Sequence, residues 1–312
     1  MPQYYIGVDG GGTKTAYALF NEKAELLLLR EGPGSNHENL ASFDEAANIL
    51  WEGIGGLLAG ASKSLGEIDF TLMGLAGVDH PFQYDALMGR LRARGLERLE
   101  ICNDGFIAIK AGSQTGAAIG LNCGTGTCCN AIDRQGRRVQ LAGLGEFSGD
   151  AANGIWIATQ AFRLAYDDVF LGIEPTLLTE LIRREFSLAQ PEALLSLIPG
   201  LEEGGGGGHV RTMIRLFFEA ANAGDAPSLR LVDQMALRGA QLIAAHLRTL
   251  DFPDPAEVVL AGSIHTKLPN RCYLEALAQK AEALGGRGLR FRLLEQPPVM
   301  GCIRWILQEY VG

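Results

Sequence analysis

The 312-residue sequence lacks the features of several protein classes. No apolar run approaches the ~20 residues that a membrane-spanning helix needs. The N-terminus has no basic region followed by an apolar stretch, so no signal peptide is expected. The formal net charge of -9 offers no basic face to a nucleic acid. These absences predict a cytoplasmic protein with no membrane or nucleic-acid partner.

Cysteine is present, but not in a pattern typical of a zinc site. The six residues are Cys102, Cys123, Cys128, Cys129, Cys272 and Cys302. None belongs to a CxxC pair, and none has the spacing of a Cys/His zinc site. Several lie in apolar runs, where a reduced cysteine behaves as a small core residue. We therefore expect free thiols in a reducing compartment and no structural metal.

Two common nucleotide-binding motifs are also missing. The order GxxxxGK[ST] is absent, which excludes a P-loop, and the absence of GxGxxG disfavours a dinucleotide fold. What is present is an ordinary globular composition, with 47% hydrophobic and 20% charged residues. The length favours two lobes over a single core.

A strand, a glycine-rich turn and a second strand occur twice in the sequence. Residues 4–8 and 15–20 flank the first turn, and residues 117–122 and 128–133 flank the second. Further strands are predicted at residues 24–30, 70–75, 99–102, 139–141, 257–261 and 289–294. Helices are predicted at residues 42–58, 83–94, 105–111, 155–165, 176–186, 210–223, 228–250, 273–284 and 299–310. The run of five glycines at residues 204–208 is predicted to be a surface loop. The repeated opening unit indicates an α/β fold of two similar lobes.

The first turn reads DGGGTKT at residues 9–15. Its glycines would let backbone amides approach an anion, and Lys14 and the hydroxyls could add donors. Asp9, at the end of a strand, could hold a hydrated Mg²⁺ ion. The alternative is an ordinary tight hairpin turn.

The second turn reads NCGTGT at residues 122–127, again between two strands. Two such turns facing each other could bind the β- and γ-phosphates of a nucleotide. An ordinary hairpin is again the alternative, so the pair of turns is more informative than either turn alone.

Three other positions have side chains suited to chemistry or recognition. Asp104 follows a strand and could take a proton from an attacking hydroxyl, although a helix N-cap is equally compatible. The loop GLGEFSGD at residues 143–150 has two carboxylates suited to hydroxyl recognition, or a capping Asp. The strand ending in Gly262 and Ser263 would let a flat ring approach the backbone, or simply marks a strand-to-helix junction.

With these motifs identified, the sequence resembles the N-acetylglucosamine kinase family, within the BadF/BadG/BcrA/BcrD-type ATPase superfamily. That superfamily includes the activator ATPases of benzoyl-CoA reductase and hydroxyacyl-CoA dehydratase. The resemblance extends over nearly the whole chain and keeps the order of the motifs. It matches the turns at residues 9–15 and 124–127 to the two phosphate loops, and Asn36 to a sugar-contacting turn. The segment GLAG at residues 74–77, Asp104 and residues 149–158 also match.

The resemblance implies two ribonuclease-H-like lobes of the actin-like ATPase fold, with mixed sheets flanked by helices around a central cleft. The first lobe would comprise residues 1–113 and 298–312, and the second residues 114–297 with a helical insertion at 155–250. The implied activity is transfer of the ATP γ-phosphate, with Mg²⁺, to the 6-hydroxyl of an amino sugar. N-acetylglucosamine or glucosamine is the expected substrate, and a homodimer is expected.

The resemblance also assigns site residues. Asp104 would be the catalytic base and would contact the sugar, and Asp9 would hold Mg²⁺ through water. The residues predicted to bind ATP are Gly10, Gly11, Gly12, Thr13, Lys14, Thr15, Gly124, Thr125, Gly126, Thr127, Gly262 and Ser263. The other residues predicted to bind the sugar are Asn36, Gly145, Glu146 and Asp150.

The sequence departs from the family at two places. The family's Gly-Asp-Glu-Gly-Ser loop is GDAAN at residues 149–153, and the bulky Phe106 replaces a small residue near the base. Two other functions remain open. One is an activator ATPase with an [Fe–S] cluster, for which Cys123 is a candidate ligand. The other is a sugar-binding regulator with weakened catalysis, which the GDAAN loop suggests.

Overall fold

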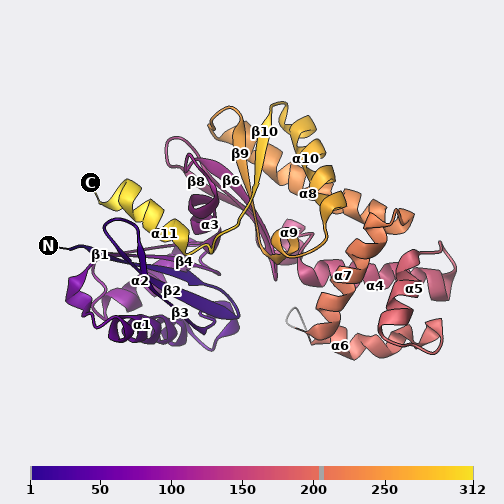
Figure 1. The fold of residues 1–312 in the computed structure, drawn as a ribbon, viewed down its shortest axis with the longest axis horizontal. Coiled ribbons are helices and arrows are strands. Elements are labelled where there is room, and N and C mark those ends of the chain that lie inside the picture. The colour runs from indigo at the N-terminus through magenta and orange to yellow at the C-terminus, as the bar shows by residue number, and fades with distance from the viewer. Residues whose placement is uncertain (1, 204–206, 312) are drawn as a thin grey trace. The chain divides into compact units, whose positions relative to one another are not determined.

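The structure is a computed structural model that describes residues 2–203 and 207–311. It divides into two compact units (Figure 1). The first comprises Met1–Gly120, Asn130–Ile132 and Leu294–Gly312, and the second comprises Leu121–Cys129 and Asp133–Leu293. The sequence predicted boundaries at residues 113 and 298. Gly120 packs on Ile109 and Asn130 hydrogen-bonds to Asn103, and these contacts join Gly120 and Asn130 to the first unit.

The first unit contains a five-stranded mixed sheet. Its strands are β1 (Tyr4–Gly10), β2 (Lys14–Asn21), β3 (Leu26–Pro33), β4 (Ile68–Leu75) and β5 (Leu99–Cys102). Their order is β3-β2-β1-β4-β5. The first three strands form antiparallel pairs, whereas β1, β4 and β5 run parallel. The carboxyl ends of these three parallel strands therefore lie at the same edge of the sheet.

Helices cover both faces of this sheet. On one face, α1 (Phe43–Gly60) and α2 (Pro81–Arg92) pack on side chains such as Ile6 and Val8. On the other face lie α3 (Asp104–Gly112) and α11 (Met300–Trp305), next to β1 and β4. Gly7 points to this second face, where an added Cβ would lie 2.7 Å from Cys302 Cβ. The alternation of Ile6, Gly7 and Val8 along β1 thus sends each neighbour to the opposite face.

The start of α1 confirms a prediction from the sequence. Ser42 Oγ accepts a hydrogen bond from Glu45 N (3.2 Å), and a Glu45 carboxylate oxygen accepts one from Ala41 N (2.9 Å). These contacts satisfy amides that have no partner within the helix.

Another five-stranded sheet has most of its residues in the second unit. Its strands are β6 (Ala118–Cys123), β7 (Thr127–Ile132), β8 (Arg138–Ala142), β9 (Ala256–Ala261) and β10 (Leu289–Leu293), in the order β10-β9-β6-β7-β8. Read from its other edge, the second sheet has the order β8-β7-β6-β9-β10. When the strands of each sheet are numbered along the chain, both sheets therefore have the order third, second, first, fourth, fifth. The duplication that the two glycine-rich turns suggested therefore extends to the whole strand order.

Helices form most of the segment between β8 and β9. They are α4 (Gly154–Tyr166), α5 (Leu177–Glu185), α6 (Ile198–Glu202), α7 (Gly208–Asn222) and α8 (Ala226–Thr249). Two more, α9 (Ser263–Thr266) and α10 (Arg271–Gly285), connect β9 to β10. The sequence missed α6 because Pro199 and Gly200 are poor helix formers. Residues 204–206 of the predicted glycine loop lie outside the described residues, and Gly208 begins α7.

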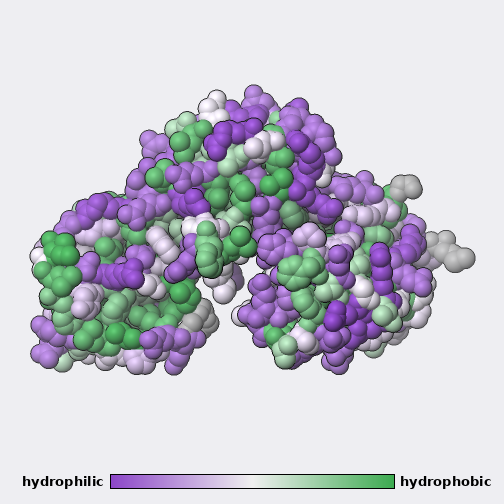
Figure 2. All heavy atoms as spheres, turned by 180° about the vertical axis from the view of Figure 1, so that it is seen from behind, coloured by the Kyte–Doolittle hydropathy of each residue, from purple (hydrophilic) through white to green (hydrophobic). Residues whose placement is uncertain are grey.

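The surface mixes hydrophilic and hydrophobic side chains, as the face in Figure 2 shows. Edge strand β3 exposes Leu26, Leu27 and Leu29. Within the described ranges, no helix has both the length and the apolar character needed to cross a membrane.

Candidate functional site

Three carboxylates gather at the carboxyl edge of the first sheet. Asp9 lies near the end of β1, Asp79 follows β4, and Asp104 is the first residue of α3, directly after β5. The charges of Asp9 and Asp79 both act on Asp104, so the three groups are close in space. Asp9 and Asp104 were predicted from the sequence, and Asp79 was not. The available signal was that all three lie at or beyond the carboxyl ends of strands that run parallel.

The environment shifts two of these carboxyl groups toward neutral pH. Burial raises the pKa of Asp104 to about 7, and the charges of Asp9 and Asp79 add to that rise. The backbone amides of Gly105 and Asp104 oppose it. Burial raises the pKa of Asp9 to about 6, with Lys14 opposing. A carboxyl group with a pKa near 7 can exchange a proton readily at physiological pH.

Asn103 fixes the backbone that presents Asp104. Its Oδ1 accepts hydrogen bonds from Gly105 N (2.9 Å) and from Asn130 Nδ2 (3.1 Å). Its Nδ2 donates to Asp79 Oδ1 (2.9 Å). Asn103 is thus the N-cap of α3 and also contacts the carboxylate of Asp79. Phe106, one turn further on, is buried in the core.

The predicted sugar-contacting Asn36 lies in the same unit. It caps the short helix η1 (His37–Asn39) by accepting a hydrogen bond from Glu38 N at 3.0 Å. Gly77, with φ of +80°, lies so close that an added Cβ would be 2.4 Å from Asn36 Oδ1. A glycine is required there both by φ and by space. Asn36 therefore lies against the segment that leads from β4 to Asp79.

The first glycine-rich turn presents backbone amides. Gly11 N donates to Lys14 O (3.0 Å), and Gly11 O accepts from Ser35 N (3.0 Å). Among the described residues, none accepts a hydrogen bond from the amides of Gly12 or Thr13, and both residues are exposed. Adjacent amides without acceptors form a concavity that suits an anion. An added Cβ at Gly34 would lie 2.3 Å from Gly12 O, so the following chain packs closely on this turn.

Two side chains of this turn have other partners. Lys14 pairs with Glu31 on the neighbouring strand. Thr15 is fully buried and donates from Oγ1 to Ser35 Oγ at 2.9 Å. The Thr15 hydroxyl therefore faces the protein and supports the turn from behind, and phosphate binding by Thr15 stays a prediction.

The second glycine-rich turn has a similar construction. Gly124 N donates to Gly126 O (2.9 Å), and the amides of exposed Thr125 and Gly126 have no acceptor within the described chain. Thr127 is buried, and its Oγ1 donates to Ala151 O at 2.7 Å. As with Thr15, this hydroxyl supports the turn, and phosphate binding by Thr127 stays a prediction.

The predicted adenosine segment lies beside the second turn. Gly262 has φ of +86°, and an added Cβ would lie 2.1 Å from Cys123 O. Ser263 begins α9 and is exposed. Gly262 and Ser263 therefore extend the surface that the second turn offers.

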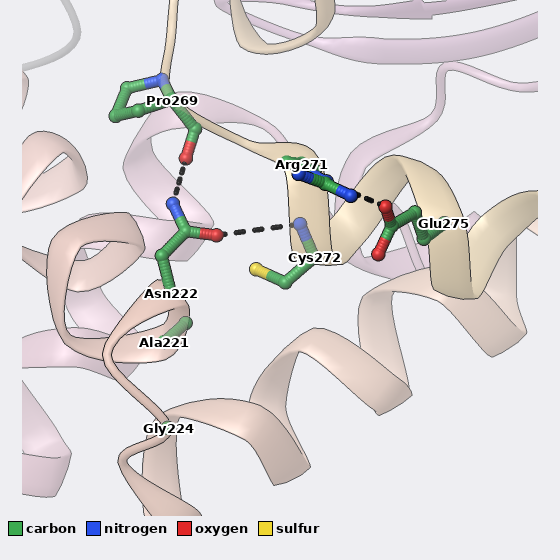
Figure 3. Close-up of a pocket in the computed structure, with 7 residues that line it drawn as sticks. All are labelled: Ala221, Asn222, Gly224, Pro269, Arg271, Cys272 and Glu275. Carbon is green, nitrogen blue, oxygen red and sulfur yellow. Dashed lines mark hydrogen bonds and ion pairs between the residues drawn. The ribbon is translucent and has the colours of Figure 1, made fainter.

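A pocket of about 430 Å³ opens a few residues beyond α9. Figure 3 shows its lining, which comprises Ala221, Asn222, Gly224, Pro269, Arg271, Cys272 and Glu275. The Asn222 side chain donates to Pro269 O and accepts from Cys272 N (3.4 Å), which joins the end of α7 to the start of α10. The neighbouring Asn270 Nδ2 donates to His265 O at 3.1 Å. These contacts tie the pocket rim to the helix that Ser263 begins.

Asp150, predicted to bind the sugar, organises its own loop. Its carboxylate accepts hydrogen bonds from Gly143 N (3.0 Å), Gly145 N (2.9 Å) and Ser148 Oγ (2.7 Å). Arg238 of α8 donates to the carbonyls of Ser148 and Gly149. Asp150 thus supports its own loop, and its contact with the sugar stays a prediction. Glu146 is exposed, and Gly145 lies on the loop surface.

The donors present fit magnesium bound mainly through water and phosphate. Among the described residues, no group of three His, Cys, Asp or Glu side chains could hold a metal ion by itself. Magnesium usually keeps several waters and takes only one or two carboxylates, with substrate phosphates completing its shell. Asp9 can supply one such carboxylate. Burial raises its pKa because the charged form is poorly solvated, and a neighbouring cation would offset that cost.

Two sheets of identical strand order, each with a glycine-rich turn after its first strand, define the class of actin-like ATPases and sugar kinases. Solved structures confirm this fold. A Chromobacterium violaceum protein provisionally named N-acetylglucosamine kinase has a TM-score of 0.70 and 21% identity, covering 98% of this chain and 99% of that one. A Streptomyces griseus ROK family glucokinase has a TM-score of 0.58 and 17% identity, covering 99% and 100%.

The chain belongs to the BadF/BadG/BcrA/BcrD ATPase family, whose model matches residues 6–282. This confirms the superfamily that the sequence motifs indicated. A curated relative is the N-acetylmuramic acid/N-acetylglucosamine kinase of Clostridium acetobutylicum, 27% identical over 75% of this chain and 76% of the relative. Another is the N-acetyl-D-glucosamine kinase of Dictyostelium discoideum, 27% identical over 62% and 64%.

Proposed function

We propose that this ATPase family member is a sugar kinase that transfers the ATP γ-phosphate to the 6-hydroxyl of an amino sugar. N-acetylglucosamine is the first candidate, because both curated relatives are named as kinases of this sugar. The name of the first relative also includes N-acetylmuramic acid. The observation that carries the proposal is Asp104, a half-buried carboxyl group with a pKa of about 7 at the edge where Asp9 and Asp79 also lie.

Asp104 acts as the general base. It accepts the proton of the sugar hydroxyl as that oxygen attacks the γ-phosphorus and the bond to the β–γ bridging oxygen breaks. Its raised pKa gives it a proton affinity suited to this transfer near neutral pH. Because Asp104 lies in the first turn of α3, its carboxylate is close to the backbone amides of Asp104 and Gly105. These amides limit the rise in the pKa of Asp104.

Each glycine-rich turn binds phosphate oxygens of ATP through its backbone amides. The donors are the amides that have no acceptor among the described residues, those of Gly12 and Thr13 in the first turn and of Thr125 and Gly126 in the second. Gly10, Gly11, Lys14, Gly124 and Thr127 complete the two binding turns. Thr15 and Thr127 contribute structural support through their buried hydroxyls. Amides that are already fixed in position stabilise charge on the transferring group without reorganisation.

The adenosine moiety contacts Gly262 and Ser263, and the adenine ring enters the pocket beside Pro269 and Cys272. The short connection from Ser263 to that pocket supports this assignment. Asp9 would hold Mg²⁺ through water, and the ion would neutralise phosphate charge.

Asn36, Gly145 and Glu146 contact the sugar. Asp150 contributes by shaping the loop that presents Gly145 and Glu146. The departure at residues 151–153 has a structural explanation: Asn153 caps α4 by accepting from Trp156 N at 2.9 Å. This replacement keeps the helix start intact, which favours an active enzyme over a disabled regulator.

The proposal includes a cytoplasmic homodimer. All six cysteines are free thiols, which suits a reducing compartment. The exposed leucines of β3 are candidates for a self-interface. An activator ATPase with an [Fe–S] cluster is disfavoured, because Cys123 is buried and burial raises its pKa to about 12, whereas cluster ligands are thiolates.

A coupled ADP-release assay with Mg-ATP tests the proposal. The panel comprises N-acetylglucosamine, glucosamine, N-acetylmuramic acid, N-acetylmannosamine and glucose. Turnover with one amino sugar well above the others would support the kinase and identify its substrate. Absence of turnover across the panel, in protein that binds ATP, would contradict the amino-sugar assignment.

A further inference from the structure

Asp79 joins two buried amide side chains in the first unit. Its backbone N–H donates to Gln83 Oε1 (2.9 Å), and its Oδ1 accepts from Asn103 Nδ2 (2.9 Å). Gln83 and Asn103 are each only 5% exposed. Buried amides are expected to have their polar atoms paired, so these contacts fix both side chains.

The contacts of Asn103 set the direction of its amide. Oδ1 accepts from Gly105 N and Asn130 Nδ2, so Nδ2 must be the group that faces Asp79 Oδ1. Reversing the amide would place an oxygen against the Asp79 oxygen and an NH₂ group against the Gly105 N–H. Asn103 therefore connects the carboxylate of Asp79 to the first turn of α3, where Asp104 lies.

Gln83 extends the connection in the other direction. Its Nε2 lies 3.4 Å from His37 Nε2, and its Oε1 also accepts from His80 N at 2.8 Å. The His37 ring stacks on Phe43 with 4.3 Å between ring centroids. His37 follows Asn36 directly, so the turn with the proposed sugar contact and the helix with the proposed base share a continuous set of polar contacts.

We propose that Asp79 is a positioning residue, which orients Asp104 through Asn103. This role rests on the function proposed above, because it belongs to the same reaction. The charge of Asp79 also acts on Asp104, and that effect can be measured without turnover.

The charged groups around Asp104 come from three elements. Asp9 faces it from β1 and Asp79 from the loop after β4, and both raise the pKa of Asp104. The amides at the start of α3 lower it. Lys14 acts on Asp9, while Glu38 and Asp79 act together on His37. Removal of the Asp79 charge should therefore lower the titration midpoint of Asp104.

Two substitutions separate charge from positioning. Asp79→Asn removes the charge but keeps an oxygen that can accept from Asn103, whereas Asp79→Ala removes both. Asp85→Asn is the matched control, because Asp85 is exposed on the neighbouring α2 and carries the same charge. Asp79→Ser is a second variant without the reach of the carboxylate, for use if Asp79→Ala fails to fold.

The first measurement is the titration of the Asp104 carboxyl ¹³C signal, assigned by its loss in Asp104→Asn. We expect Asp79→Asn to lower the midpoint by about 0.5–1 pH unit, since one like charge is removed. Asp85→Asn should leave it unchanged. The second measurement is kcat at the plateau of the pH profile. Asp79→Asn should stay within ~3-fold of wild type, and Asp79→Ala should fall about 10-fold, with the KM for ATP unchanged.

An unchanged Asp104 midpoint in Asp79→Asn would overturn the charge effect. Equal kcat values in Asp79→Asn and Asp79→Ala would overturn the positioning role. If the wild-type protein transfers phosphate to no sugar, the proposed function fails and the positioning role fails with it, while the ¹³C titration still decides the charge effect. The failure of one proposal is thereby distinguished from the failure of the other.

Discussion

The central strands of the two sheets begin alike and end differently. Residues 6–9 read IGVD and residues 119–122 read IGLN. A helix packs closely against the glycine of each strand. An added Cβ at Gly7 would lie 2.7 Å from Cys302 Cβ, and one at Gly120 would lie 2.6 Å from Ile109 Cγ1. The fourth residue is a carboxylate in one strand and an amide in the other. The packing of the two strands is duplicated, whereas the carboxylate proposed to hold Mg²⁺ occurs only in the first strand.

The turns that follow repeat the same plan. Each exposes two adjacent amides, at Gly12 and Thr13 and at Thr125 and Gly126, and each is supported by a buried threonine. The turns thus offer similar backbone donors to an anion. The titratable groups, Asp9, Asp79 and Asp104, all belong to the first unit. We expect substitutions to separate these shared and unshared properties.

The largest effect is expected at Asp104. Asp104→Ala removes the proposed base, so kcat should fall ~10²–10⁴-fold. The dissociation constant for ATP should stay within a few-fold, because the phosphate amides are untouched. The coupled ADP-release assay and calorimetry with ATP measure the two quantities. Unchanged turnover would reject Asp104 as the base.

The next effect concerns the residue in which the two strands differ. Asp9→Asn makes the first turn resemble the second, and we expect kcat to fall about 10²-fold with a higher Mg²⁺ requirement. Asn122→Ala serves as the control and should leave the Mg²⁺ requirement unchanged. A titration of initial rate against Mg²⁺ concentration measures both. Equal responses in the two variants would show that the units share the metal-dependent chemistry after all.

The shared packing predicts similar losses of stability. Gly7→Ala and Gly120→Ala each place a methyl group against a helix, and each should lower the free energy of unfolding by about 1–3 kcal/mol. Gly126→Ala is a suitable control, because nothing lies within 4 Å of an added Cβ there. Urea denaturation provides the measurement. A loss at only one of the two strand glycines would contradict the proposed equivalence.

The smallest effect is a pH dependence that belongs to the first unit. The folded-state pKa values of Asp9 and Asp104, about 6 and about 7, exceed the ordinary Asp value of 3.8. The folded chain therefore binds more protons than the unfolded chain between these values, and its stability falls as pH rises from about 4 to about 7. Asp104→Asn should remove part of this loss, raising Tm by about 2–5 °C at pH 8 but not at pH 4.

Asp85→Asn, on the exposed surface of α2, should leave the difference in Tm between pH 4 and pH 8 as in wild type. Differential scanning calorimetry at the two pH values is sufficient. A rise in Tm at pH 4 equal to that at pH 8 would show that Asp104→Asn acts through packing and not through protonation.

Local sequence was enough to predict the strands, both turns and the start of α1, because apolar patterns, glycines and the Ser42 cap are local signals. It was also enough to find Asp9 and Asp104 at strand ends. Asp79 was missed because its importance depends on β4 lying between β1 and β5, which is a property of strand order. The side-chain directions of Thr15 and Asp150 depend on contacts with Ser35 and with the loop's own amides, and residue type alone does not reveal them.

The short helix α11 determines when the first unit can be completed during synthesis. It supplies the buried residues Cys302, Ile303 and Trp305, and Gly301 lets it approach the carbonyl of Ile107 in α3. The ribosome produces β1 long before α11, so the first unit cannot close its core until α11 has been synthesised. The second unit, which ends at Leu293, needs no later segment. A nascent chain would therefore carry a complete second unit while its first unit still presents an open apolar surface to chaperones.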